Sequence, residues 1–252
     1  MNPNIYQSII EGVKKKKKKL AILIDPDKFS TSVALKNGIA SGVDFIFVGG
    51  SLLSHGSLQR CVKTVKETTD IPLVLFPGST DQIDPNADGI LFLSLISGRN
   101  SDNLIGKHVI SAPLLKKTSL EIIPTGYMLI DGGNSTSASY MSNTIPIPHA
   151  KDDIAVCTAM AGEMLGLKLI YLDTGSGALK HVSTNMIQQV KKNINIPLII
   201  GGGIKKPEKA YDLCIAGADI LVIGTIAEQS PELISEIANA VHQSSDYIAS
   251  LK

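Results

Sequence analysis

Two glycine-rich segments near the C-terminus have the residue types that bind phosphate. Gly201, Gly202 and Gly203 follow the apolar run PLII, and Gly224 with Thr225 follows the next run, DILVI. Glycine lets backbone N–H groups approach an anion closely, and a threonine hydroxyl can add a hydrogen bond. A single cluster could serve only to make a tight turn. Because two successive runs end in this way, the sequence favours a phosphate site.

Two acidic residues follow the first apolar run, in the segment LIDPDK. Asp25 and Asp27 flank Pro26, which fixes the backbone between them. Carboxylate oxygens suit Mg²⁺, which commonly takes one or two carboxylates together with phosphate oxygens and water. Ser51, at the end of VGGS, can add a hydroxyl ligand. These residue types also cap helices, with Asp27 the better candidate for a cap, so a metal site and capping both stay open.

A tyrosine and an aspartate stand two residues apart in the segment YLDTGSGA. Residues at this spacing point to the same side of a strand, so Tyr171 and Asp173 can face one ligand. Asp173 can orient an alcohol or accept its proton, and Gly175, Ser176 and Gly177 can wrap around the polar end of that ligand. In the alternative interpretation, Tyr171 packs in the core and Asp173 caps the next helix.

These groups can meet only if the fold brings the ends of several apolar runs together. Eight runs rich in Ile, Leu and Val recur, each followed by a longer amphipathic stretch: 20–24, 44–48, 72–76, 89–93, 126–130, 168–172, 197–200 and 219–223. They are almost continuously apolar, as in parallel strands buried on both faces. The pattern predicts an α/β fold, a single (β/α)8 TIM barrel over residues 1–252, with a doubly wound open sheet as the alternative.

Two of the intervening stretches carry clear helix signals, and one does not. Helices are predicted over 183–193 and over 206–217, where Pro207 suits a first turn and Gly217 a C-terminal cap. The segment 131–149 is rich in Ser, Thr, Asn and Gly and is too long for a simple connection. We expect this segment to be a long loop that serves the site at the barrel top.

Composition narrows the class of protein. The formal net charge of +1 argues against a nucleic-acid binder, and 44% hydrophobic residues suit a large core. The three cysteines form no CxxC pair, so we expect buried thiols and neither a disulfide nor a zinc site. The sequence shows neither a signal-peptide pattern nor an apolar run long enough for a bilayer, which predicts a cytoplasmic protein. The lysine run 14–19 predicts a solvated segment, with transient attraction to a membrane surface or diphosphate as the alternative.

Five segments, taken in order, resemble the geranylgeranylglyceryl phosphate synthase family and its bacterial heptaprenylglyceryl phosphate synthase relatives: LIDPDK, DFIFVGGS, YLDTGSGA, IIGGGIK and ILVIGTIAE. The resemblance covers nearly the whole chain. It implies a prenyltransferase of ether phospholipid biosynthesis with a barrel fold. Such an enzyme transfers the prenyl group of a polyprenyl diphosphate, here expected to be geranylgeranyl, to the free hydroxyl of sn-glycerol 1-phosphate, and releases diphosphate with the help of Mg²⁺.

The resemblance also implies roles for individual residues. Asp25 and Ser51 would bind Mg²⁺. Glycerol phosphate would be held by Tyr171, Leu172, Asp173, Thr174, Gly175, Ser176, Gly177, Gly202, Gly203, Gly224 and Thr225. Asp173 would orient or deprotonate the attacking hydroxyl, and the ring of Tyr171 would lie beside developing positive charge. The family more often has glutamate at position 173, so a bridging water becomes an alternative to direct proton transfer to the shorter aspartate.

The resemblance also implies an oligomer and a prenyl groove, and the residues alone leave other functions open. Members of the family form dimers or hexamers, which implies a homo-oligomer, with Tyr140 as an interface aromatic or instead part of a lid or of the packing. Aromatic residues are only 4% of the chain, so aliphatic side chains must supply most of a prenyl groove. From the residues alone, another barrel acting on a small sugar phosphate, or a non-catalytic binder of a phosphorylated ligand or flavin mononucleotide, stays open.

Overall fold

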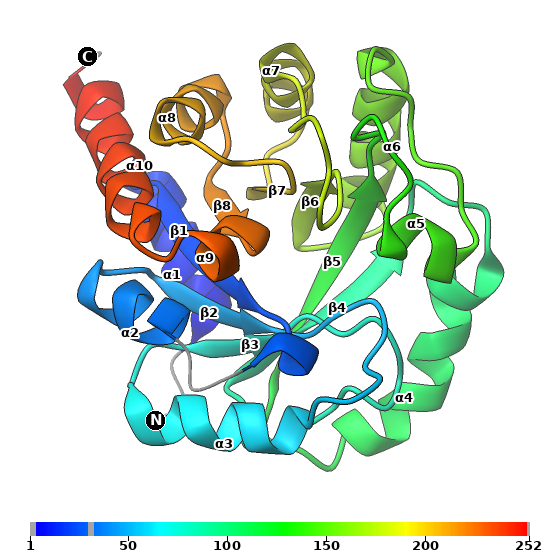
Figure 1. The fold of residues 1–252 in the computed structure, drawn as a ribbon. Helices are drawn as coiled ribbons and strands as arrows, with labels where there is room; N and C mark the ends of the chain where they lie inside the picture. The colour runs from blue at the N-terminus through cyan, green and yellow to red at the C-terminus, as the bar shows by residue number, and fades with distance from the viewer. Residues whose placement is uncertain (1–3, 30–32, 251–252) are drawn as a thin grey trace.

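The protein is a closed barrel of parallel strands in a computed structural model that describes residues 4–29 and 33–250 (Figure 1). The strands pair in chain order: β1 Lys19–Ile24, β2 Phe45–Val48, β3 Leu73–Leu75, β4 Gly89–Leu95, β5 Glu121–Leu129, β6 Leu169–Asp173, β7 Leu198–Gly201 and β8 Ile220–Ile223. β8 pairs with β1, so the sheet has no free edge. The predicted barrel is confirmed and the open sheet is wrong.

Helices surround the barrel (Figure 1). They are α1 Ile5–Lys14, α2 Val33–Ala40, α3 Leu58–Thr68, α4 Lys107–Leu115, α5 Ser137–Ser142, α6 Asp152–Met164, α7 Thr184–Asn193, α8 Pro207–Ala216, α9 Thr225–Gln229 and α10 Leu233–Ser250, with short helical turns η1 Pro26–Lys28 and η2 Asp102–Gly106. The predictions around 183–193 and 206–217 are confirmed: Ser183 caps α7, and Gly217 ends α8 with φ 126°. Within the described part of the chain, no helix has the length and apolarity needed to cross a membrane.

Strand residues alternate between two apolar cores, which explains why the runs read as continuously apolar. Ala21 faces the barrel interior together with Ile199 and Val222. Leu20 and Ile22 face outward and pack beneath the helices. Both faces of each strand are therefore buried, as in other parallel barrels.

Helix α1 closes the N-terminal end of the barrel. Ile5 and Ile9 are buried and belong to the interior core. Glu121, the first residue of β5, accepts hydrogen bonds from the backbone N–H groups of Ile5 and Tyr6, which fixes the start of the helix. With this end plugged, the opposite end is left for a site.

Three local expectations are wrong. The lysine run is not wholly solvated, because Lys18 pairs with Asp219 and Lys19, the first residue of β1, pairs with Asp44. Cys157 is exposed on α6, whereas the other two cysteines are buried as expected. The segment 131–149 is not only loop, because Thr136 caps the short helix α5 within it.

Candidate active site

A cleft of about 610 Å³ opens at the C-terminal ends of the strands. Most of the residues singled out in the sequence line it: Asp25, Ser51, Tyr171, Asp173, Gly175, Ser176, Gly177, Gly202, Gly203, Gly224 and Thr225. The fold therefore brings residues from β1, β2, β6, β7 and β8 to one cavity, as the position of active sites in such barrels predicts. Lys14–Lys19 runs from the end of α1 to the first residue of β1, at the other end of the barrel from this cleft, so its charge does not line the cleft.

Two expected site residues do not line the cleft. Leu172 is fully buried in the outer core between strands and helices, because it points away from the interior side that Tyr171 and Asp173 face. Thr174 is also buried, and its hydroxyl has no hydrogen-bond partner. Neither side chain lines the cleft, and the expected contact of these two residues with glycerol phosphate stays a prediction.

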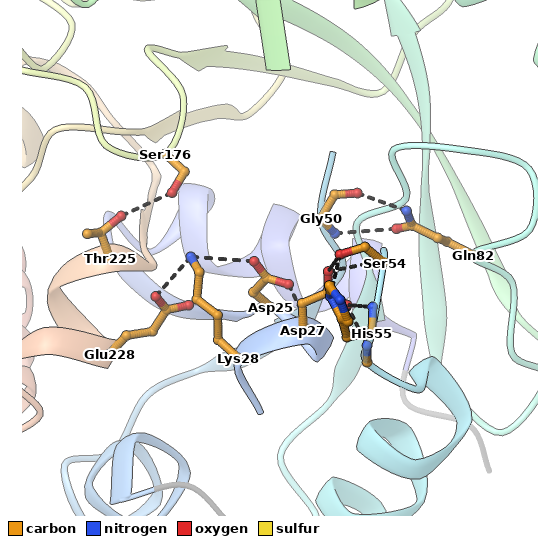
Figure 2. Close-up of polar contacts among 11 residues, drawn as sticks. Asp25, Asp27, Lys28, Gly50, Ser54, His55, Gln82, Ser176, Thr225 and Glu228 are labelled. Atoms are coloured by element: carbon orange, nitrogen blue, oxygen red, sulfur yellow. Dashed lines mark hydrogen bonds and ion pairs between the residues drawn. The ribbon is translucent and has the colours of Figure 1, made fainter. Parts of the chain in front are cut away.

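The loops after β6 and β7 meet through glycines with left-handed backbone. Gly202 has φ 80°, and a Cβ atom there would lie 2.3 Å from Thr174 Oγ1 and 2.8 Å from Asp173 Oδ1. No larger residue fits without moving these groups. The loop after β6 also reaches the end of β8, where Ser176 Oγ lies 3.1 Å from Thr225 Oγ1 (Figure 2). Glycine backbone and hydroxyls thus form a polar cup at one end of the cleft.

Asp173 is a buried carboxylate at the base of this cup. Its Oδ2 accepts a hydrogen bond from the Tyr127 hydroxyl at 2.7 Å, and its Oδ1 accepts one from Gly175 N at 2.7 Å. Burial raises the pKa of Asp173, the two hydrogen bonds lower it, and the net result lies above the ordinary aspartate value. A carboxylate with a raised pKa is a better proton acceptor than an ordinary aspartate.

Three aromatic rings form the floor of the cleft beside Asp173. Phe76 stacks on Tyr171 with 5.3 Å between ring centroids, and Tyr127 meets Tyr171 edge-on at 5.4 Å. Burial raises the pKa of both tyrosines well above the ordinary value, so both are neutral phenols. Leu93, Leu95 and other apolar residues continue this floor into an apolar wall: Pro77, Ala138 and Met141.

Asp25 lies across the cleft, immediately after β1. Its Oδ1 accepts a hydrogen bond from Asp27 N at 3.0 Å, so Asp25 itself begins the turn η1, and the preference for Asp27 as the cap is wrong. Its Oδ2 lies 3.5 Å from Lys28 Nζ, which also pairs with Glu228 Oε2 at 3.2 Å (Figure 2). Burial lowers the pKa of Lys28, but the charges of Glu228 and Asp25 outweigh this effect and raise it.

Asp27 fastens the loop after β2 to the loop after β1 (Figure 2). Its carboxylate accepts backbone hydrogen bonds from Ser54, His55 and Gly56, and these bonds hold its pKa well below the ordinary value. On the other side, Gln82 binds both the N–H and the carbonyl of Gly50. The loop that carries Ser51 is therefore held from both sides.

The acidic side of the cleft fits a Mg²⁺ ion that is only partly held by protein. Asp25 offers carboxylate oxygens, and Ser51 offers a hydroxyl at the same cavity. Among residues 4–29 and 33–250, no group of three or more His, Cys, Asp or Glu side chains could hold a metal ion. Mg²⁺ commonly completes its shell with phosphate oxygens and water, and a small donor set beside an open cleft suits that habit.

Tyr127, Lys28 and Glu228, which line the cleft, and Gln82, which holds Gly50 beside it, were not expected from the sequence. Tyr127 could have been found from its spacing, since it stands two residues before Leu129 on an inward-facing strand position. Lys28, Gln82 and Glu228 had no such signal, because each lies beyond the end of a strand, in a segment whose path only the folded chain fixes.

Comparison with known proteins identifies close relatives of this chain. Residues 13–241 match the PcrB family. The chain is 53% identical over 246 residues to the geranylgeranylglyceryl phosphate synthase of Chitinophaga pinensis, covering 96% of this chain and 97% of that protein. It is 51% identical over 230 residues to the protein of the same name from Spirosoma linguale, covering 90% and 92%.

A solved structure is similar to this chain in both fold and sequence. The crystal structure of (S)-3-O-geranylgeranylglyceryl phosphate synthase from Thermoplasma acidophilum, in complex with its substrate sn-glycerol-1-phosphate, superimposes with a TM-score of 0.89 at 31% identity, covering 95% of this chain and 98% of that one. A tryptophan synthase alpha chain from Legionella pneumophila is similar at a TM-score of 0.58 and 17% identity, which is a likeness of fold alone.

Proposed function

The chain belongs to the PcrB family, and from this premise we propose that it is a prenyltransferase that joins sn-glycerol 1-phosphate to a polyprenyl diphosphate through an ether bond. The product would be a precursor of ether phospholipids, with geranylgeranyl diphosphate as the expected donor. The names of the relatives support the activity, and the substrate in the Thermoplasma acidophilum complex supports the acceptor.

The observation that carries this proposal is the union of three features in one cleft. A cup of glycines and hydroxyls lies at one end, a carboxylate with a raised pKa lies at its base, and a second carboxylate lines the same cleft as a set of apolar side chains. A phosphorylated alcohol suits the cup, and a diphosphate with an apolar tail suits the rest.

Each residue then has a definite task. Gly202, Gly203 and Thr225 hold the phosphate of the acceptor, and Asp173 orients its free hydroxyl and takes the proton as the oxygen attacks the allylic carbon. A carbon–oxygen bond forms to the acceptor while the bond to the diphosphate breaks. The neutral rings of Tyr171 and Tyr127 stabilise positive charge that develops on the allylic carbon.

Asp25 and Ser51 are the residues that would hold Mg²⁺. A bound Mg²⁺ would neutralise the charge that grows on the departing diphosphate. The apolar wall from Phe76 to Met141 takes the prenyl chain, and this stretch mixes aliphatic with aromatic side chains.

The activity is tested with the purified protein, Mg²⁺, sn-glycerol 1-phosphate and a series of prenyl diphosphates, followed by mass spectrometry of the lipid extract. An ether product is expected, most rapidly with geranylgeranyl diphosphate. The enantiomer sn-glycerol 3-phosphate serves as the acceptor control, and Asp25→Asn, which removes the charge but keeps the shape of the side chain, should abolish the Mg²⁺-dependent product.

The absence of an ether product would point to another function. No product with any donor, together with binding of a sugar phosphate or flavin mononucleotide, would favour the other phosphate-binding functions that the glycine-rich strand ends allow.

We infer a homo-oligomer from the apolar flank of the barrel. Helices α4, α5 and α6 share this flank in Figure 1, and large apolar side chains on and beside them are exposed: Ile105, Val109, Ile110, Leu114, Tyr140, Ile145, Met164 and Leu165. Monomers rarely leave so many such residues uncovered on one side. The cytoplasmic location stays a prediction.

A further inference from the structure

Lys28 links two acidic residues across the mouth of the cleft. Its ammonium lies 3.5 Å from Asp25 Oδ2 and 3.2 Å from Glu228 Oε2, so it bridges the loop after β1 and helix α9 (Figure 2). All three side chains line the cleft, and the side chain of Lys28 is 52% exposed. The half-exposed ammonium therefore offers a positive charge to an anion in the cleft.

The bridge also occupies the carboxylate expected to bind the metal. Asp25 Oδ1 already accepts a hydrogen bond from Asp27 N, and Oδ2 faces the ammonium. A divalent cation that approaches Asp25 meets a positive charge at contact distance, which opposes its binding. The same lysine has a flexible stem and a second anchor in Glu228, so it can leave Asp25 without losing every partner.

We propose that Lys28 couples metal binding to diphosphate binding. Without diphosphate, its ammonium holds Asp25 and keeps the affinity for a free divalent cation low. When a diphosphate enters, Lys28 turns to the phosphate oxygens and releases Asp25 to the metal. The cation is thus taken up with the diphosphate and not before it. This inference rests on the proposed function, because that function supplies the diphosphate.

The donor set of the site supports this order. Asp25 and Ser51 are few ligands for Mg²⁺, which usually relies on substrate phosphate oxygens for the remainder. A lysine is a common partner of phosphate and binds it as a point charge. Once the diphosphate is present, its oxygens can complete the shell of the Mg²⁺ ion and also pair with Lys28. Without the diphosphate, neither contact can form.

The test measures binding and needs no turnover. Mn²⁺ binding is followed by electron paramagnetic resonance, and pyrophosphate binding by calorimetry, each alone and then together. In the wild-type protein, pyrophosphate should tighten Mn²⁺ binding by about 10-fold or more, within the usual range for coupled sites. In Lys28→Met, Mn²⁺ alone should bind several-fold more tightly, pyrophosphate more weakly, and most of the coupling should be lost.

Two further variants separate the effect of the Lys28 charge from the effect of losing any exposed ion pair. Lys28→Arg keeps the charge and should retain the coupling. Lys209→Met is the matched control: Lys209 is 51% exposed and pairs with Asp212 at 3.1 Å on α8, so it has a similar ion pair away from the cleft, and its loss should leave both affinities unchanged.

The outcomes separate this inference from the proposed function. Wild-type coupling in a folded Lys28→Met variant, or Mn²⁺ affinity that does not rise, overturns the inference even if prenyl transfer is observed. A gain in Mn²⁺ affinity with the coupling intact assigns Lys28 only a general electrostatic effect and also overturns it. Loss of coupling together with a rise in Mn²⁺ affinity in that variant supports the inference even if no prenyl donor reacts.

Discussion

At the scale of single residues, the environment of Asp173 determines when it can accept a proton. Burial raises its pKa, and the hydrogen bond from Tyr127 lowers it, with a net rise. Because the base must be ionised, activity should fall as the pH drops through this raised pKa. Tyr127→Phe removes a lowering contribution, so the acidic limb of the kcat/KM profile should move to higher pH.

The profile of Tyr127→Phe is compared with those of the wild type and of Tyr211→Phe. Tyr211 lies on α8, away from the cleft, and its change should leave the limb in place. A limb that moves to lower pH, or does not move, would mean that Asp173 is not the group that titrates.

Gly202 should be needed for binding of sn-glycerol 1-phosphate. Gly202→Ala places a methyl group 2.3 Å from Thr174 Oγ1, in a backbone conformation with φ 80°. The loop must shift, so KM for sn-glycerol 1-phosphate should rise about 10-fold or more, the cost of losing one good hydrogen bond, while KM for the prenyl donor stays close to the wild-type value. Measurement of both constants separates a local effect from general damage.

Gly42→Ala is the control for backbone strain. Gly42 has φ 71°, yet a Cβ atom there meets nothing within 4 Å. It should cost about 1 kcal/mol of stability through strain alone and leave both KM values unchanged. If the two variants behave alike, strain and not the close contact explains the result.

The sequence could predict most residues of the site because strand ends converge in a barrel. Asp25, Asp173 and the glycines were found because each directly ends an apolar run. Leu172 and Thr174 were included only because they lie within the segment YLDTGSGA, although the alternation of a strand turns Leu172 outward. Lys28 and Glu228 could not be paired from sequence, since 200 residues separate them and only closure of β8 on β1 brings them together.

At the scale of elements, an aspartate before a strand fastens that strand to the preceding one in three places. Asp44, Asp88 and Asp219 each donate the backbone N–H to a leucine carbonyl of the preceding strand and accept the N–H of the same leucine. A lysine pairs with each aspartate as well. The device sets the register at the starts of β2, β4 and β8.

Of the three aspartates, Asp219 should contribute most to the stability of the fold, because its side chain is 5% exposed and it binds Lys18, Lys191 and Leu198 N. Asp219→Ala leaves two lysines without this partner in a buried setting. We expect the free energy of unfolding to fall by about 3 kcal/mol, as for other broken buried ion pairs. Urea denaturation followed by circular dichroism measures the change.

Asp212→Ala provides the comparison, because it breaks an exposed pair with Lys209. Its effect should stay below about 1 kcal/mol. Equal effects of the two variants would show that the fastening at β8 contributes nothing beyond a surface ion pair.

Strands were easier to predict than their limits or the short helices. Burial on both faces makes each strand a run of apolar residues, which a sequence displays directly. β5 begins at Glu121, five residues before the expected run at 126, because Glu121 binds α1 and Pro124 does not end the strand. Helix α5 was missed because its cap and its first turn are serine and threonine, which also make loops.

At the scale of the whole molecule, the two ends of the barrel have separate tasks. The N-terminal end is plugged by α1 and fastened by ion pairs, whereas the C-terminal end carries the cleft. This division lets the loops around the cleft differ in length and polarity without loss of the barrel. The flank formed by α4, α5 and α6 is the remaining surface with a distinct character.

The exposed apolar side chains of this flank predict that copies of the chain assemble through it. Tyr140 and Ile145 are 83% and 89% exposed, so a partner that covers them would remove a large apolar surface from water and stabilise the complex. Light scattering after gel filtration should give a mass that is a multiple of 26.7 kDa. Replacing both residues by serine should weaken association about 10-fold or more, whereas Tyr247→Ser, on α10, should not. A wild-type mass of one chain at every concentration would contradict the homo-oligomer, and an unchanged mass in the double variant would place the interface elsewhere.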